Sequence, residues 1–321
     1  MKVSIGKLRV FAGCALVACA ALGPVAASAQ DYPSRQVTIV VPYGPGGSND
    51  TYSRVLADKL SKLWKQTVII DNKPGAGSAI GSAHVAKSKP DGYTLLFNSA
   101  SYAAVAAMQK QLPFDPINAL QPIALAYDAN FYVLTGKRTP MPTLEDIRKQ
   151  GKATKLFTTT PGVGSITHLA GLLMDNALGI TTEYVHHTSG ANMLADVGGG
   201  RADITYGVDF EAKTGAATPI ALLSKKRSES FPNLPTIAEA GLPDATLQLW
   251  FGVFAPAGTP KAIIDKINHD IVAVNKAPDM AEFLKTQGIS FSDMKSEEFA
   301  KLVRSDVERY TAVAEKHGMR K

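Results

Sequence analysis

The chain contains very little cysteine: two of its 321 residues, Cys14 and Cys19, both close to the N-terminus. Catalytic signatures are missing as well, because no G-x-S-x-G and no H-E-x-x-H motif occurs, and no two of the six histidines have the spacing of metal ligands on one helix. Neither nucleotide-binding fingerprint, G-x-x-x-x-G-K-S/T or G-x-G-x-x-G, is met. We therefore predict a protein that is not an enzyme and that uses no metal and no cofactor.

The N-terminal residues combine a basic start, an apolar run and a stretch of small residues that ends in Ala27-Ser28-Ala29. This pattern predicts a secretory signal peptide over residues 1–29, removed by cleavage before Gln30. A second interpretation takes Leu16-Val17-Ala18-Cys19 as a lipobox, which would leave a lipidated cysteine at the mature N-terminus. Cleavage after residue 29 leaves no cysteine, which excludes disulfides, thiol nucleophiles and thiolate metal sites.

The charge balance indicates no particular polymer as a partner. Three of the 34 basic residues and none of the 28 acidic residues belong to the predicted leader, so its removal lowers the net charge from +6 to +3. The remaining charges are interspersed, and we predict no nucleic-acid partner. Outside the leader no apolar run approaches the ~20 residues that span a bilayer, and the rest of the chain is long enough for two domains of about 100–200 residues.

The most informative stretch, residues 37–50, has an apolar strand followed by a proline- and glycine-rich loop and then a helical pattern. A helix start presents unpaired N–H groups and a partial positive charge, which together attract an anion. The loop glycines that would let an anion approach closely are Gly44, Gly46 and Gly47. Ser48 or Asn49 is predicted as the N-cap, and Asp50 suits the first turn. An ordinary strand-to-helix turn explains the same residues equally well.

Short β-rich runs alternate with helical patterns along the chain, which is typical of an α/β protein with mainly parallel sheets. The predicted strands cover residues 67–70, 93–97, 131–134, 156–159, 182–185, 204–206 and 220–223. In such sheets ligands bind beyond the carboxyl ends of strands, where the first loop would lie. Two extended apolar segments, 122–127 and 250–256, are predicted to pass between two domains.

A series of short motifs then identifies a family. They are Tyr32-Pro33-Ser34, Val41-Pro42-Tyr43-Gly44-Pro45-Gly46-Gly47, Asn72-Lys73-Pro74-Gly75-Ala76-Gly77, Pro90-Asp91-Gly92-Tyr93, Leu112-Pro113-Phe114-Asp115-Pro116, His168-Leu169-Ala170-Gly171, Leu234-Pro235-Thr236-Ile237 and Trp250-Phe251-Gly252. With these motifs in this order, the whole mature chain resembles the periplasmic substrate-binding components of tripartite tricarboxylate transporters, the Bug-type solute receptors.

The resemblance implies a type II periplasmic-binding-protein fold of the Venus-flytrap kind. Each of two lobes has a mixed, mainly parallel sheet, and a two-strand hinge joins them. Residues 30–126 plus 250–321 would form the first lobe, and residues 127–249 the second. The lobes would close on the ligand by hinge motion. The implied location is the periplasm, and a monomer is expected.

The resemblance also implies the ligand and its site. The ligand is a small carboxylate, such as a di- or tricarboxylate, an acidic amino acid or an aromatic acid, held partly through waters between the loops 43–50 and 159–168. The second loop repeats the pattern of the first, with bare glycine backbone and hydroxyls at a helix start. The predicted ligand-binding residues are Tyr43, Gly44, Pro45, Gly46, Gly47, Ser48, Asp50, Ser99, Thr160, Gly162, Gly164, Ser165, Thr167, His168, Thr188 and Asp209.

The sequence departs from the family pattern at Thr188-Ser189 and at Gly207, so no member's specificity is transferred to it. Asp50 is predicted to tune selectivity, and His168 is either a ligand contact or a packing and capping group. The implied partners are the membrane components of a tripartite tricarboxylate-type transporter. Two other hypotheses remain: a receptor that presents its closed form to a sensor kinase, and an exported protein that has kept the fold but lost its ligand.

Overall fold

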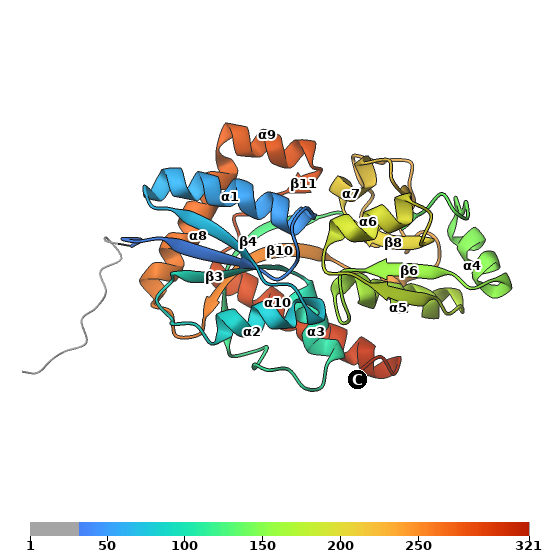
Figure 1. Cartoon of the computed structure of the whole chain (residues 1–321), viewed down its shortest axis with the longest axis horizontal. Helices are drawn as coiled ribbons and strands as arrows, with labels where there is room; N and C mark the ends of the chain where they lie inside the picture. The colour runs from blue at the N-terminus through green and yellow to red at the C-terminus, as the bar shows by residue number, and fades with distance from the viewer. Residues whose placement is uncertain (1–31, 321) are drawn as a thin grey trace, which may run out of the picture.

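The computed structural model describes residues 32–320, which form two α/β lobes side by side (Figure 1). The predicted signal peptide, residues 1–29, lies outside the described residues, as does the alternative lipidation site at Cys19. Within the described part, no helix has the length and apolar character that a membrane span requires. The two-lobed α/β architecture predicted from the sequence is confirmed.

The first lobe is built on a six-stranded sheet with the strand order β11-β4-β10-β3-β1-β2. Its strands are β1 (Val37–Val41), β2 (Val68–Asn72), β3 (Thr94–Ser99), β4 (Leu120–Ala129), β10 (Leu249–Pro256) and β11 (Ile289–Ser290). Helices cover both faces of this sheet (Figure 1). On one side lie α1 (Ser48–Trp64), α8 (Lys261–Lys276) and α9 (Pro278–Thr286), and on the other α2 (Ala79–Ala86), α3 (Ser101–Met108) and α10 (Ser296–Lys316), with a 3-10 turn η2 (Ala76–Ser78) before α2.

The second lobe is built on a five-stranded sheet with the strand order β7-β6-β8-β5-β9. Its strands are β5 (Tyr132–Thr135), β6 (Phe157–Thr160), β7 (Glu183–His186), β8 (Ile204–Gly207) and β9 (Thr218–Leu222). Figure 1 shows α5 on one face of this sheet and α6 with α7 on the other. The helical elements are α4 (Leu144–Ala153), α5 (Ile166–Leu178), α6 (Gly190–Gly198), α7 (Asp209–Lys213) and the 3-10 turn η3 (Pro243–Ala245).

Both sheets are mixed, as predicted, but parallel pairing does not predominate. Of the nine strand pairs among residues 32–320, four are parallel and five antiparallel. β10 runs antiparallel to β3 and β4, and β5 runs antiparallel to β8 and β9. These strands stand at the passages between the lobes, so they enter their sheets from the opposite end to the strands of the βαβ units.

The two lobes are joined by neighbouring strands. β4 and β10 pair antiparallel from Leu120 opposite Pro256 to Ala129 opposite Leu249. Just beyond this pair, the Leu223 N–H donates to the Phe131 carbonyl at 2.7 Å. The chain therefore leaves the first sheet after β4 and returns to it through β10. The domain bounds predicted above fall within β4 and at the start of β10, and they stay a prediction.

The core of the first lobe lies on β10, where every residue is buried because helices cover both faces of the sheet. Gly252 on this strand leaves room for the Phe299 ring of α10, since a Cβ at position 252 would lie 2.2 Å from the ring. The same ring packs edge-on against Trp250, with the centroids 5.3 Å apart. The Trp250 indole N–H donates to the Asp306 carboxylate of α10 at 2.7 Å. Ring packing and this hydrogen bond attach α10 to the sheet.

Replacing Phe299 by alanine should lower the free energy of unfolding by about 3–5 kcal/mol, because it leaves a cavity in a fully packed core. Urea unfolding followed by circular dichroism measures the loss. Leu63→Ala is the matched control, since Leu63 on α1 is 50% exposed and such surface changes stay within about 0.5 kcal/mol. Equal losses for the two variants would contradict the packing role given to Phe299.

Candidate ligand-binding site

The loop after β1 leads into α1 without a side-chain cap. The N-cap is Gly47, with extended backbone at φ −93° and ψ 174°, and the helix begins at Ser48. The prediction of Ser48 or Asn49 as the N-cap was therefore wrong by one or two residues, because the glycine takes the extended conformation that ends the loop. The prediction that Asp50 lies in the first turn is confirmed.

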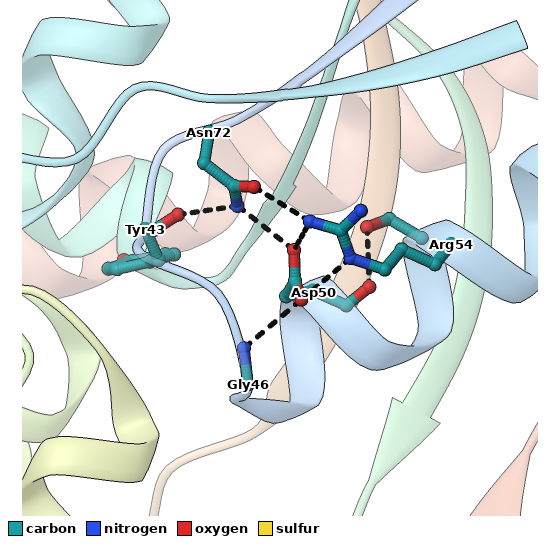
Figure 2. Close-up of polar contacts among 6 residues, drawn as sticks. Tyr43, Gly46, Asp50, Arg54 and Asn72 are labelled. Atoms are coloured by element: carbon teal, nitrogen blue, oxygen red, sulfur yellow. Dashed lines mark hydrogen bonds and ion pairs between the residues drawn. The ribbon is translucent and has the colours of Figure 1, made fainter.

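The Asp50 side chain turns back and fastens this loop (Figure 2). Its carboxylate accepts a hydrogen bond from the Gly46 N–H at 3.1 Å, two from the Arg54 guanidinium at 2.9 Å each, and one from the Asn72 amide at 3.0 Å. The Asn72 amide also donates to the Tyr43 carbonyl at 2.8 Å. Burial alone would raise the pKa of Asp50, but the hydrogen bonds from Arg54, Asn72 and Gly46 outweigh it and lower the pKa. The ionised Asp50 carboxylate therefore receives its hydrogen bonds from residues of the protein itself.

The loop between β6 and α5 holds its shape through a different set of bonds. Ser165 is the N-cap of α5, and its hydroxyl accepts from the His168 N–H at 3.2 Å. The Gly164 N–H donates to Nδ1 of His168 at 3.1 Å, and Gly162 and Gly164 have φ of +136° and +84°, where other residues are strained. The His168 ring packs edge-on against Tyr184 at 4.8 Å. These contacts give His168 a packing and capping role.

Backbone contacts close the two lobes on each other. The Gly44 N–H of the first lobe donates to the Thr188 carbonyl of the second at 2.7 Å. The Ile166 N–H at the start of α5 donates to the Ser101 hydroxyl of α3 at 3.0 Å. At Gly77 the approach is so close that an added Cβ would lie 2.2 Å from the carbonyl oxygen of Val163. The structure is therefore the closed form of a two-lobed protein.

The closed lobes enclose a cavity of about 60 Å³ beyond the ends of β1, β3 and β8. Its volume leaves room for only a small molecule. Its lining includes seven of the residues predicted from the sequence, Tyr43, Gly44, Gly47, Ser48, Asp50, Ser99 and Thr167. The other walls come from residues outside the predicted set of ligand-binding residues, chiefly Asn49, Ser101, Phe131, Pro161, Ile166, Met193, Tyr206, Val208, Glu211 and Phe251.

The remaining predicted residues do not line this cavity. Gly46 faces α6, because a Cβ added to Gly46 would lie 3.3 Å from the Cβ of Ala191. Thr160 forms a hydrogen bond with Nδ1 of His186 at 2.6 Å. The Asp209 carboxylate accepts from the Tyr132 hydroxyl at 2.9 Å. The full set comprises Pro45, Gly46, Thr160, Gly162, Gly164, Ser165, His168, Thr188 and Asp209. Several of these residues shape the two loops through the contacts given above.

Glu211 is the principal cavity residue that sequence reasoning missed. It lies on the five-residue helix α7 and is 5% exposed. Its Oε2 accepts from the Val208 N–H at 3.0 Å. Burial raises the pKa of Glu211, against the opposing effect of the Val208 N–H and of the Ser48 N–H and hydroxyl across the cleft. No local motif marks this residue, because its partner Ser48 belongs to the other lobe.

Two α/β lobes joined by adjacent strands, with two strand-to-helix loops closed over a small cavity, define a solute-binding receptor of the periplasmic-binding-protein type. The chain belongs to the tripartite tricarboxylate transporter family receptor group, whose family model matches residues 52–319. This membership confirms the resemblance stated above.

Individual relatives agree with this assignment. A UPF0065 protein from the tcbD-tcbE intergenic region of Pseudomonas sp. (strain P51) is 32% identical over 96% of this chain and 93% of its own. The solved structure of periplasmic binding protein BugD has a TM-score of 0.85 at 28% identity, covering 90% of this chain and 100% of that chain. MatC (Rpa3494) from Rhodopseudomonas palustris with bound malate has a TM-score of 0.83 at 28% identity, covering 88% and 99%.

Gly77→Ala should hold the lobes apart, because its Cβ would overlap the backbone of Val163 and Ser165. We expect a larger radius of gyration than that of the wild type in small-angle X-ray scattering. Gly179→Ala is the control, since Gly179 has φ +63° against +65° for Gly77 but nothing within 4 Å of its Cβ position. Both variants should lose about 1–2 kcal/mol of stability from left-handed strain. An unchanged radius for Gly77→Ala would refute the closure contact.

Glu211→Gln should change how stability depends on pH. Because burial raises the pKa of Glu211 in the folded state, its contribution to stability is present below its unfolded pKa and is lost as the pH rises through the folded pKa. Glutamine does not ionise, so the variant should gain stability relative to the wild type as the pH rises above about 4, the ordinary range of a glutamate. Urea unfolding at a series of pH values measures the difference. A constant difference across the range would show that Glu211 is not destabilised by burial.

Proposed function

We propose that this protein is a periplasmic receptor that captures a small carboxylate between the loops 43–50 and 159–168. The cavity between the lobes carries the proposal, because its lining combines hydroxyl-bearing residues, among them Ser48, Ser99 and Thr167, with the start of α1. N–H groups in the first turn of a helix have no partner within the helix and favour an anion. The malate bound to MatC supports a carboxylate as the ligand class.

The two loops are proposed to contribute unequally. In the second loop, the Ile166 N–H is bonded to Ser101 and the His168 N–H to Ser165. The Gly164 N–H is bonded to the His168 ring. We therefore assign the direct contact of this loop to Thr167, and the main anion contact to the first turn of α1 after Gly47. Waters between ligand and loops would cost little affinity.

The proposed mechanism is capture followed by closure. A ligand that contacts both loops binds the closed form better than the open form and shifts the population toward it. The adjacent strands β4 and β10 are the proposed hinge. The proposed partner is the membrane part of a tripartite tricarboxylate-type transporter, in keeping with the family description. A pull-down from membranes with saturated receptor would distinguish this partner from a sensor kinase.

Isothermal titration calorimetry tests the proposal on protein that starts at Gln30 and has been unfolded and refolded to remove bound ligand. The panel contains malate, adipate, benzoate, alanine and valine, with glucose as the uncharged control. At least one carboxylate should bind, and Thr167→Val should weaken it by about 10–100-fold, the usual effect of losing a hydrogen bond to a charged group. Thr246→Val, at a half-buried position outside the cavity lining, should change affinity by less than about twofold. Binding of glucose alone would refute the carboxylate assignment.

A further inference from the structure

The charged side chains that line the cavity are both acidic. Among the described residues of the lining, Asp50 and Glu211 are the acids, and no lysine, arginine or histidine takes part. The Asp50 charge is matched by Arg54, whose guanidinium donates two hydrogen bonds to it. The ion pairs of residues 32–320 give Glu211 no such partner; the nearby Lys213 pairs with Asp209 at 3.4 Å. Glu211 is thus the uncompensated acid of the site.

The position of Glu211 is shaped by the residues around it. Gly207, at the end of β8, leaves the space that the Glu211 side chain fills, because a Cβ at position 207 would lie 2.8 Å from the Glu211 Cβ. From there the carboxylate reaches across the cleft to the neighbourhood of the Ser48 N–H and hydroxyl. This is the start of α1, the main anion contact proposed above, so a ligand carboxylate bound there has Glu211 beside it, and a ligand ammonium group next to that carboxylate would match both. A second ligand carboxylate placed there would meet a buried acid that has no cation beside it.

A second acceptor, on a residue that lines the cavity, also requires a donor. The side-chain oxygen of Asn49 is buried and has no hydrogen-bond donor among the described residues, and Asn49 lines the same cavity. A buried acceptor without a donor costs free energy that a ligand N–H would recover. An ammonium group offers three such donors and a positive charge. The apolar remainder of the lining, chiefly Phe131, Ile166, Met193 and Phe251, suits a hydrocarbon side chain.

We propose, as an extension that rests on the carboxylate-receptor function above, that Glu211 binds the ammonium group of the ligand and selects small apolar amino acids with one carboxylate. Dicarboxylates and tricarboxylates without an amine are disfavoured, because the cavity provides no cationic side chain for a second carboxylate and presents Glu211 to it. Burial favours protonation of Glu211, and a bound ammonium group would offset this by stabilising the ionised carboxylate.

Matched ligand pairs test this selection by calorimetry on the refolded mature chain. The pairs are valine with 3-methylbutanoate and alanine with propanoate, which differ only in the amino group, and malate is the dicarboxylate. The wild type should bind the amino member of a pair at least about tenfold more tightly, as expected for a buried ammonium–carboxylate pair. E211Q should lower this ratio at least about tenfold. E229Q is the matched control, since Glu229 is exposed on the same lobe, and it should keep the wild-type ratio.

A second variant tests the same position independently. Gly207→Ala should reduce the amine preference as well, because the added methyl would displace Glu211. Circular dichroism checks the fold of both variants, and the amine preference of the wild type tests the selection itself whether or not the variants fold.

The outcomes separate the two proposals. Absence of binding by every acid, with or without an amine, would overturn the receptor function itself. Acids that bind equally well with and without the amine, or malate that binds better than both amino acids, would overturn the selection and leave the receptor function standing. A preference that persists in E211Q would overturn the assignment to Glu211.

Discussion

The geometry of the site depends on one buried carboxylate, that of Asp50. It draws together the loop after β1 through Gly46, the second turn of α1 through Arg54 and the end of β2 through Asn72. Because its donors come from three segments, a change in any of them leaves a buried charge incompletely satisfied, which is costly. The loop consequently has one well-defined shape, and the start of α1 faces the cavity. The charge that positions the loop is therefore not free to bind a ligand strongly.

Closure of the two lobes depends on glycines, which have no side chain at the points of contact. Gly44 hydrogen-bonds through its backbone to Thr188, and Gly77 approaches Val163 so closely that a methyl group does not fit. Contacts of this kind bring the backbones of the two lobes to hydrogen-bonding distance. A receptor that must open again to release its ligand benefits from such an interface, because the closed form then depends on the ligand for much of its stability.

The chemistry of the cavity follows from how its two acids are paired. Asp50 has a guanidinium and an amide of its own, whereas Glu211 reaches its polar neighbour Ser48 across the cleft. A helix start that favours anions and a buried acid thus lie at the same place. In the proposed selection this site discriminates by repulsion as well as attraction, since a ligand would supply one negative group and avoid placing another next to Glu211.

Local signals allowed much of this protein to be predicted from the sequence. Alternating and apolar runs mark the strands, and prolines and glycines mark the loop before α1, because these properties act within a few residues. The family motifs add the two-lobed fold. Tertiary structure decided which side chains share the cavity. Asp209 and His168 follow strand ends, as cavity residues do. However, the Asp209 carboxylate accepts a hydrogen bond from the Tyr132 hydroxyl, and the His168 ring accepts one from the Gly164 N–H. Glu211 became a cavity residue only through closure against Ser48, a contact between distant parts of the chain that no local pattern encodes.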